Sequence, residues 1–120
     1  RQNMSMWETI ELLGYTYFSE KGWRILCPLV KNEGYDFVAK KEGDFIRVNV
    51  KLAGLKCKSE PNSWSVSVAS GSGKKAVTDV RCDLYLVWVP TKHKFVELPG
   101  DFFLDNKSKS KRIPRKYLEG

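Results

Sequence analysis

The sequence predicts an α+β fold in which an N-terminal helix packs on a mixed central β-sheet. Apolar residues recur at steps of three and four near the N-terminus, as on one face of a helix. Two runs with alternating apolar residues flank a polar turn at residues 40–44, which is typical of a β-hairpin. Residues 83–90 form a continuous apolar run, which indicates a strand buried on both faces. We expect this strand at the centre of the sheet.

The first element is expected to be a helix over residues 4–21. Ser5 is a suitable N-cap, and Glu8 stands three residues later, as in a capping box. Gly22 marks the end of the pattern. The apolar stripe consists of Met6, Ile10, Leu13, Tyr17 and Phe18. Because only one face is apolar, the helix should pack on the sheet through that face.

The rest of the chain is expected to form strands and loops. Pro28 interrupts the run at 23–30, which places that strand at an edge or end of the sheet. Residues 54–63 are polar and basic, and residues 70–80 are rich in Gly, Ser and Lys, so both are expected to be loops. The expected strands cover residues 23–30, 35–40, 44–53, 64–70, 83–90 and 95–99.

The composition indicates one globular domain. The chain has 120 residues, of which 42% are hydrophobic, so it can bury a core. We expect a single domain over residues 1–120 with a basic tail over about 105–120. No apolar run reaches the roughly 18 residues of a membrane span, and the N-terminus lacks the order of a signal peptide. We therefore expect a cytoplasmic, nucleoid-associated protein with no membrane partner.

Charge and cysteine content narrow the partner class. The formal net charge is +7, and basic residues concentrate at 51–58 and 107–116, which favours nucleic acid as a partner. The three cysteines, Cys27, Cys57 and Cys82, are odd in number and widely spaced. This pattern indicates neither a disulfide framework nor a CxxC zinc site. We expect reduced and mostly buried thiols.

Four polar residues can converge at the hairpin. Asp36 begins one hairpin strand, and Asn49 and Lys51 lie on the next. Since alternate side chains of a strand share a face, Asn49 and Lys51 point the same way, and strand pairing brings Asp36 near them. Glu11 lies beside the apolar stripe of the helix and can face the same cluster. Glu11, Asp36, Asn49 and Lys51 are therefore the candidate catalytic residues.

This set of side chains is suited to phosphodiester hydrolysis, which requires a nucleophilic water and neutralisation of charge on the phosphoryl oxygens. Oxygen ligands from Asp36, Asn49 and Glu11 can hold Mg²⁺ (or Mn²⁺), which meets both requirements. Lys51 can orient the water, help to deprotonate it or stabilise the developing negative charge. The sequence thus predicts a metal-dependent hydrolytic site at the hairpin.

The arrangement resembles the PD-(D/E)XK nuclease superfamily, in which an acid opens one hairpin strand and an acid or amide, any residue and a lysine occupy the next. The matching residues are Tyr35-Asp36 and Asn49-Val50-Lys51. Glu11 resembles the helix-one glutamate of archaeal Holliday-junction resolvases and of group I intron endonucleases. The order of EKGW, CPL, GYDF and VNVK is similar to the intron-associated branch. The resemblance implies a restriction-endonuclease-like fold and a metal-dependent endonuclease acting on duplex or branched DNA.

Two residues depart from the pattern of the superfamily. Tyr35 stands where the name has a proline, which shapes the backbone and does no chemistry. Asn49 replaces the usual acid or glutamine. A neutral amide oxygen binds a hard cation less strongly than a carboxylate does. The alternative interpretation is therefore a DNA-binding module that kept the nuclease fold and lost an acid at position 49.

Basic residues outside the catalytic set are candidates for contacts with DNA phosphates. They are Lys56, Lys58, Lys74, Lys75, Lys111, Arg112, Arg115 and Lys116. Because one such site cuts one strand, we also expect a homo-oligomer, either a dimer or a tetramer. A further alternative is an RNA-binding sheet with Tyr85 and Phe95 exposed on adjacent strands, and the buried character of residues 83–90 counts against it.

Several other residues have simpler explanations than catalysis. Glu8 lies farther from the apolar stripe than Glu11 and is explained by the capping box. Residues 70–75 (SGSGKK) lack the order of a phosphate-binding loop. His93 lies in a Lys-rich turn, where an exposed residue is expected rather than a metal ligand. The tryptophans are expected in the core, with Trp64 kept as a candidate for stacking on a base.

Overall fold

The computed structural model describes residues 5–30, 34–67, 79–106, 108 and 110–119. Its helices and strands are α1 (Met6–Ser19), β1 (Arg24–Leu26), β2 (Phe37–Lys41), β3 (Asp44–Leu52), β4 (Gly54–Leu55), β5 (Trp64–Ser67), β6 (Leu84–Val89), the 3-10 helix η1 (Pro90–Lys92), β7 (Lys94–Pro99), β8 (Ser110–Arg112) and α2 (Arg115–Leu118). No helix in this described part of the chain is long and apolar enough to cross a membrane.

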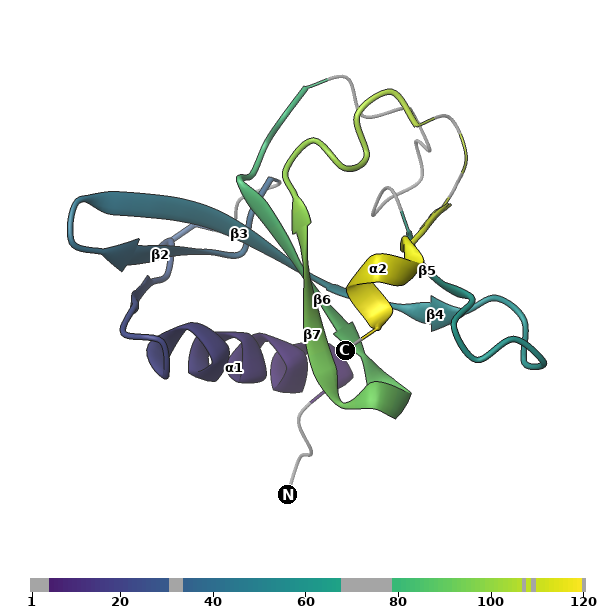
Figure 1. Cartoon of the computed structure of the whole chain (residues 1–120). Helices are drawn as coiled ribbons and strands as arrows, with labels where there is room; N and C mark the ends of the chain where they lie inside the picture. The colour runs from purple at the N-terminus through teal and green to yellow at the C-terminus, as the bar shows by residue number, and fades with distance from the viewer. Residues whose placement is uncertain (1–4, 31–33, 68–78, 107, 109, 120) are drawn as a thin grey trace.

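The main sheet has five strands in the order β1-β2-β3-β6-β7, with α1 packed along one side of it (Figure 1). Strand β3 pairs antiparallel with β2 and parallel with β6, whereas β6 and β7 are antiparallel. This mixed sheet with an N-terminal helix confirms the predicted α+β class. Strand β1 lies at the sheet edge, as Pro28 predicts. The middle strand is β3, so the prediction that residues 83–90 form the centre is wrong.

The position of β6 explains why its sequence resembles a central strand. Its side chains alternate between two cores, one on each face of the main sheet. Leu86 lies in the core beneath α1, while Tyr85, Val87 and Val89 lie in the core shared with the second sheet. Both faces are therefore covered although β6 is one strand away from the centre.

Helix α1 has the capping box that the sequence predicts. The Ser5 hydroxyl accepts the N–H of Glu8, and the Glu8 carboxylate accepts the N–H of Ser5. The helix buries Ile10, Gly14 and Phe18, which recur every four residues on the face toward the sheet. At Gly14, an added Cβ would lie 3.4 Å from the Leu86 side chain, an ordinary van der Waals contact, so the helix packs directly on β6 there.

A second sheet of three strands, in the order β4-β5-β8, lies beside the main sheet together with α2 (Figure 1). The expected strand at 64–70 belongs to this sheet and not to the mixed sheet. The expected tail at 105–120 contributes β8 and α2, and it buries Ile113 and Leu118 completely or nearly so. The C-terminal residues that the structure describes are therefore part of the fold, because their apolar members close the second core.

Gly100 provides a test of this packing. A Cβ on Gly100 would lie 2.1 Å from the backbone oxygen of Cys82, closer than real Cβ atoms approach. We expect Gly100→Ala to lower the free energy of unfolding by roughly 1–3 kcal/mol, because the backbone after β7 must shift. Urea unfolding measures the change. Gly43→Ala is the matched control, since a Cβ there has no atom within 4 Å. Equal stability of the two variants would contradict the prediction.

Candidate active site

Asp36, Asn49 and Lys51 lie on the face of the main sheet opposite α1. Val48 and Val50 belong to the core beneath α1, so the alternate residues of β3, Asn49 and Lys51, point to the other face. Phe37 pairs with Val48, and its side chain also enters the α1 core. Asp36 precedes Phe37 by one residue and is therefore placed beside Asn49. The predicted hairpin register thus brings the three polar residues together.

The carboxylate of Asp36 takes the place of a main-chain acceptor where β2 begins. The Val50 N–H donates to its Oδ2 at 2.6 Å, and the Asp36 N–H donates to the Val48 carbonyl at 2.8 Å. These two bonds fix the carboxylate against β3. A carboxylate has about four lone-pair positions, so accepting this N–H leaves it able to bind a cation as well.

The Asn49 side chain is oriented by the loop that precedes Asp36. Its Nδ2 donates to the Gly34 carbonyl at 3.3 Å. The amide oxygen, which is the atom able to ligate a metal ion, therefore points away from Gly34. This orientation makes Asn49 an oxygen donor toward the sheet face that carries Asp36.

Lys51 is enclosed by aromatic side chains of the second core. Its Nζ lies 5.8 Å from the ring centroid of Tyr85 and 5.7 Å from that of Phe103. Burial lowers the pKa of Lys51, and the charge of Asp36 opposes that shift. The ammonium group is thus held in a partly desolvated position beside an acid, where it can donate to a substrate oxygen or exchange a proton more readily than an exposed lysine.

Glu11 lies on α1, which covers the face of the sheet opposite Asn49 and Lys51. Tyr15 follows Glu11 by one helical turn, and its ring packs edge-on against Phe37 with centroids 5.0 Å apart. Burial, a hydrogen bond with the Cys27 thiol and the charges of Glu11 and Asp36 raise the pKa of the Tyr15 phenol. Both acids therefore act on the Tyr15 phenol, which stays protonated. Its spacing of four residues from Glu11 is the signal that could have identified it.

The residues predicted to hold a metal ion are Asp36 and Glu11, through their carboxylates, and Asn49, through its amide oxygen. These are hard oxygen donors of the type that Mg²⁺ prefers. Within the described ranges, no group of three or more His, Cys, Asp or Glu residues is arranged to hold a metal ion. Any site here therefore depends on the Asn49 amide as its third side-chain donor.

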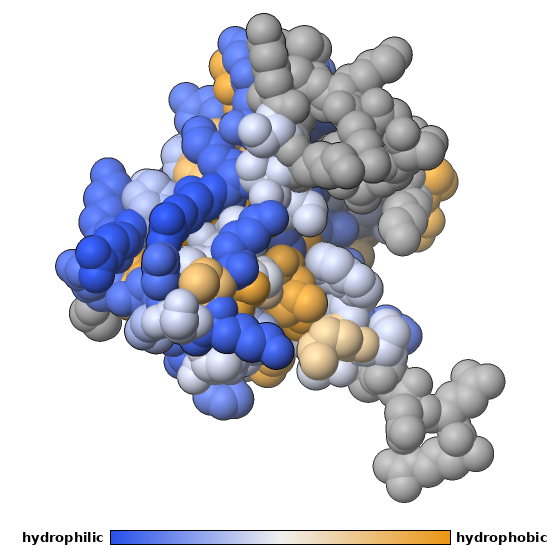
Figure 2. Space-filling view, turned by 90° about the vertical axis from the view of Figure 1, so that its right-hand side faces the viewer, coloured by the Kyte–Doolittle hydropathy of each residue, from blue (hydrophilic) through white to orange (hydrophobic). Residues whose placement is uncertain are grey.

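The predicted DNA-binding residues fall into two groups around the second sheet. Lys56 and Lys58 lie in the loop between β4 and β5, and the other described members lie on β8 and α2: Lys111, Arg112, Arg115 and Lys116. The view toward this side shows a mainly hydrophilic surface with a smaller apolar area (Figure 2). Lys74 and Lys75 lie outside the described residues. The fold thus brings two basic segments, distant in sequence, to one side of the molecule.

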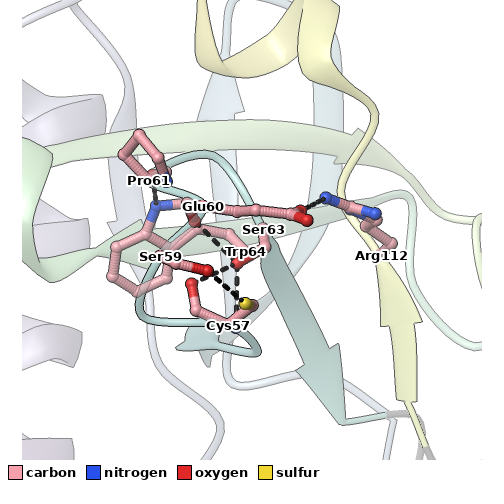
Figure 3. Close-up of polar contacts among 7 residues, drawn as sticks. All are labelled: Cys57, Ser59, Glu60, Pro61, Ser63, Trp64 and Arg112. Atoms are coloured by element: carbon pink, nitrogen blue, oxygen red, sulfur yellow. Dashed lines mark hydrogen bonds and ion pairs between the residues drawn. The ribbon is translucent and has the colours of Figure 1, made fainter.

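A hydrogen-bond network holds the β4–β5 loop against β8 (Figure 3). The Ser63 hydroxyl accepts the Cys57 N–H at 2.9 Å and lies 2.8 Å from the Glu60 carbonyl oxygen. Arg112 joins the loop through an ion pair with Glu60 at 3.1 Å. The Lys111 ammonium donates to the Phe102 carbonyl at 2.6 Å. Arg112 and Lys111 therefore have partners within the protein, which reduces their availability to DNA.

The structure also decides several of the minor predictions. Trp64 is 3% exposed and its indole N–H donates to the Pro61 carbonyl at 3.0 Å, so the prediction of a base-stacking role is wrong. Tyr85 is buried in the second core, whereas Phe95 packs on the α1 side, so they form no shared platform for RNA. His93 is the exposed C-cap of η1.

The cysteines differ from expectation. Cys82 is buried, as predicted, but Cys57 is half-buried and Cys27 is exposed. The prediction of mostly buried thiols is therefore wrong. All three are free thiols.

Two comparisons with known proteins agree with this geometry. A family model described as PD-(D/E)XK endonuclease matches residues 15–115, a span that contains Asp36, Asn49 and Lys51 and begins after Glu11. The solved structure of a bacterial homing endonuclease, I-Ssp6803I, is similar with a TM-score of 0.66 at 21% identity. That similarity covers 88% of this chain and 70% of the other. At this identity it is evidence for the fold alone. No curated protein matches the chain.

The partly buried environment of Lys51 predicts that its positive charge lowers the stability of the fold. We expect Lys51→Met to raise the free energy of unfolding near neutral pH by on the order of 1 kcal/mol, because methionine fills the space beside Tyr85 and Phe103 without a charge to desolvate. Since the pKa of Lys51 is lowered on folding, wild-type stability rises as pH rises from the folded pKa toward the ordinary value of 10.5. The gain should therefore be largest at low pH and smallest above 10.5.

Urea unfolding of wild type and Lys51→Met between pH 6 and pH 10.5 measures this gain. Lys58→Met is the control, because Lys58 is an exposed lysine of the β4–β5 loop and its replacement should change stability by less than about 0.5 kcal/mol. Destabilisation by Lys51→Met at every pH would contradict the interpretation.

Proposed function

Because the chain belongs to the PD-(D/E)XK endonuclease family, we propose that it is a metal-dependent endonuclease that hydrolyses phosphodiester bonds in duplex or branched DNA. The observation that supports this most directly is the convergence of Asp36, Asn49 and Lys51 on one sheet face, with Asp36 fixed to the Val50 N–H at 2.6 Å. The substrate and the metal dependence are parts of the proposal.

In this proposal Asp36, Asn49 and Glu11 hold Mg²⁺ or Mn²⁺ through oxygen atoms. A bound divalent ion would neutralise charge on the phosphoryl oxygens and lower the pKa of a ligated water. Lys51 would donate to a phosphoryl oxygen or orient the attacking water, and its position beside aromatic rings strengthens such an interaction by excluding solvent. Cleavage of both strands would require a dimer or tetramer, since one site of this type cuts one strand.

The alternative is a non-catalytic DNA-binding module of the same fold. The observation that favours it is the neutral amide at position 49 in a site with two carboxylates. Metal dependence of cleavage distinguishes the two functions, because a module that only binds DNA does not nick it when Mg²⁺ or Mn²⁺ is added.

Cleavage should depend on Asp36 and Lys51. We expect Asp36→Asn and Lys51→Met each to lower the rate of metal-dependent cleavage by roughly 10²–10⁴-fold, because the first removes a ligand charge and the second removes a proton donor. Supercoiled plasmid and a synthetic four-way junction, each incubated with Mg²⁺, Mn²⁺ or EDTA, provide the assay. The Lys92→Met variant should cut like the wild type, because Lys92 lies in η1, outside the candidate site and the predicted DNA-binding set. Unchanged cleavage by both site variants, with their folds intact, would exclude this site.

Asn49 should respond to the addition of a carboxylate. We expect Asn49→Asp to lower the melting temperature without metal. An aspartate cannot donate to the Gly34 carbonyl, and its negative charge would repel that of Asp36. Mn²⁺ should then stabilise this variant more than the wild type and bind it on the order of ten-fold more tightly, because divalent ions respond to ligand charge. Calorimetric titration and thermal unfolding with and without Mn²⁺ measure both effects.

Asn106→Asp is the matched control for this experiment. The Asn106 side chain also donates to a backbone carbonyl, that of Ser108 at 3.0 Å, but it follows β7 in the chain and is not one of the predicted metal ligands. Its replacement should remove a similar hydrogen bond, but Mn²⁺ should neither stabilise this variant nor bind it more tightly. An equal Mn²⁺ response in both variants, or none in either, would place Asn49 outside the site.

A further inference from the structure

The sheet face that carries the candidate site continues along β1, β2 and β3 away from the second sheet. Lys40 lies on the same face as Asp36, because four residues separate them on β2. Its cross-strand partners are Phe45 on β3 and Arg24 on β1. We call this the outer face and define it by Arg24, Leu26, Val38, Lys40, Phe45 and Arg47.

The outer face is accessible where the hairpin extends past the end of α1. Leu26 is 44% exposed and Phe45 is 58% exposed. The neighbouring residues that point the other way, Ile25 and Ala39, pack in the core beneath α1. Figure 1 shows β2 and β3 reaching outward above the helix. The outer face is thus the side of the hairpin that α1 does not cover.

Two positively charged side chains lie opposite each other on this face, an arrangement that does not stabilise the fold. Arg24 and Lys40 are direct cross-strand partners, and like charges directly opposite each other destabilise a sheet. Among the ion pairs of the described residues, none includes Arg24 or Lys40. The Lys40 ammonium lies 5.7 Å from the Phe45 ring centroid, which supports it on this face. An anionic ligand would relieve the repulsion between the two cations.

The spacing from the candidate site fits a phosphate backbone. Four residues of a strand span roughly 13 Å, which separates Lys40 from Asp36. Phosphates of one B-DNA strand advance about 3.4 Å each along the helix axis. Because the strand also winds around the duplex, a backbone held at Asp36 would present to Lys40 and Arg24 phosphates only a few nucleotides away.

We propose that the outer face binds the DNA backbone beside the scissile phosphate, with Arg24 and Lys40 as phosphate contacts. This inference rests on the proposed function, because the candidate site on the same face supplies the reason to expect DNA rather than another anion. The basic residues that were selected from the sequence and that the structure describes lie elsewhere, around the second sheet. The outer face would thus give the site a second DNA contact on its other side.

The salt dependence of binding tests the proposal. Binding of a fluorescent 30-base-pair duplex is measured by anisotropy in EDTA at several salt concentrations, so that no cleavage is required. We expect the Arg24→Gln/Lys40→Gln double variant to reduce the slope of log K against log salt by about 1.8, which is 0.9 for each lost phosphate contact, and to weaken binding at 0.1 M salt by more than about ten-fold. Its melting temperature should not fall, because a repulsive pair is removed.

The matched control is Lys21→Gln/Lys92→Gln, which removes the same charge. Lys21 lies over the Tyr17 ring beyond the end of α1, and Lys92 lies in η1 between β6 and β7. The control should change the slope by less than about 0.5. Equal slopes for the two double variants would overturn the proposal. A change in oligomeric state by sedimentation, without a change in slope, would assign the outer face to self-association and also overturn it.

Failure of the proposed function is distinguishable from failure of this inference. Suppose that the double variant shows the expected reduction in slope, but the wild type does not cut DNA with Mg²⁺ or Mn²⁺. The outer face is then supported and the endonuclease activity is not. If the wild type shows no salt-dependent binding, both are overturned. If the double variant fails to fold, the single variant Arg24→Gln is expected to reduce the slope by about 0.9.

Discussion

The alternation of side chains along β3 is the constraint on which the core and the candidate site both depend. Val48 and Val50 enter the core beneath α1, and Asn49 and Lys51 therefore face the opposite side. A slip of one residue would place a lysine under the helix and valines in the site. The register is held from two directions, because β3 pairs with β2 on one side and with β6 on the other.

Asp36 and Asp83 each reinforce that register through main-chain bonds. The Asp36 carboxylate accepts the Val50 N–H, and the Asp83 carboxylate accepts the Arg47 N–H at 2.8 Å while also binding its guanidinium group. Thus Asp36 fixes β3 on the side of β2, and Asp83 fixes it on the side of β6. For Asp36 the same contact orients the carboxylate for chemistry. A residue with both roles cannot be replaced without some effect on local structure, so conservative amide variants are more informative than alanine.

The features predictable from the sequence are those encoded by local patterns. The capping box at Ser5 and the alternation in the hairpin define α1, β2 and β3, and with them the grouping of Asp36, Asn49 and Lys51 on one face. The second sheet was not predicted, because β5 and β8 pair across a long interval and no local pattern marks that contact. The burial of Trp64 follows from the same missed pairing. Tyr15 was assigned no role, since its packing on Phe37 depends on how α1 crosses the sheet.

The late position of β8 sets an order for folding during synthesis. The five-stranded sheet is complete at Pro99, whereas β5, already paired with β4, gains its second partner β8 only when residues 110–112 have been made. Until then Trp64 and Val66 lack their cover, and a stalled chain would expose apolar surface to proteases and chaperones. Phe103, which encloses the Lys51 ammonium, is also made late. In an unfinished chain Lys51 would therefore be more exposed to water. The environment of the site thus depends on completion of the polypeptide.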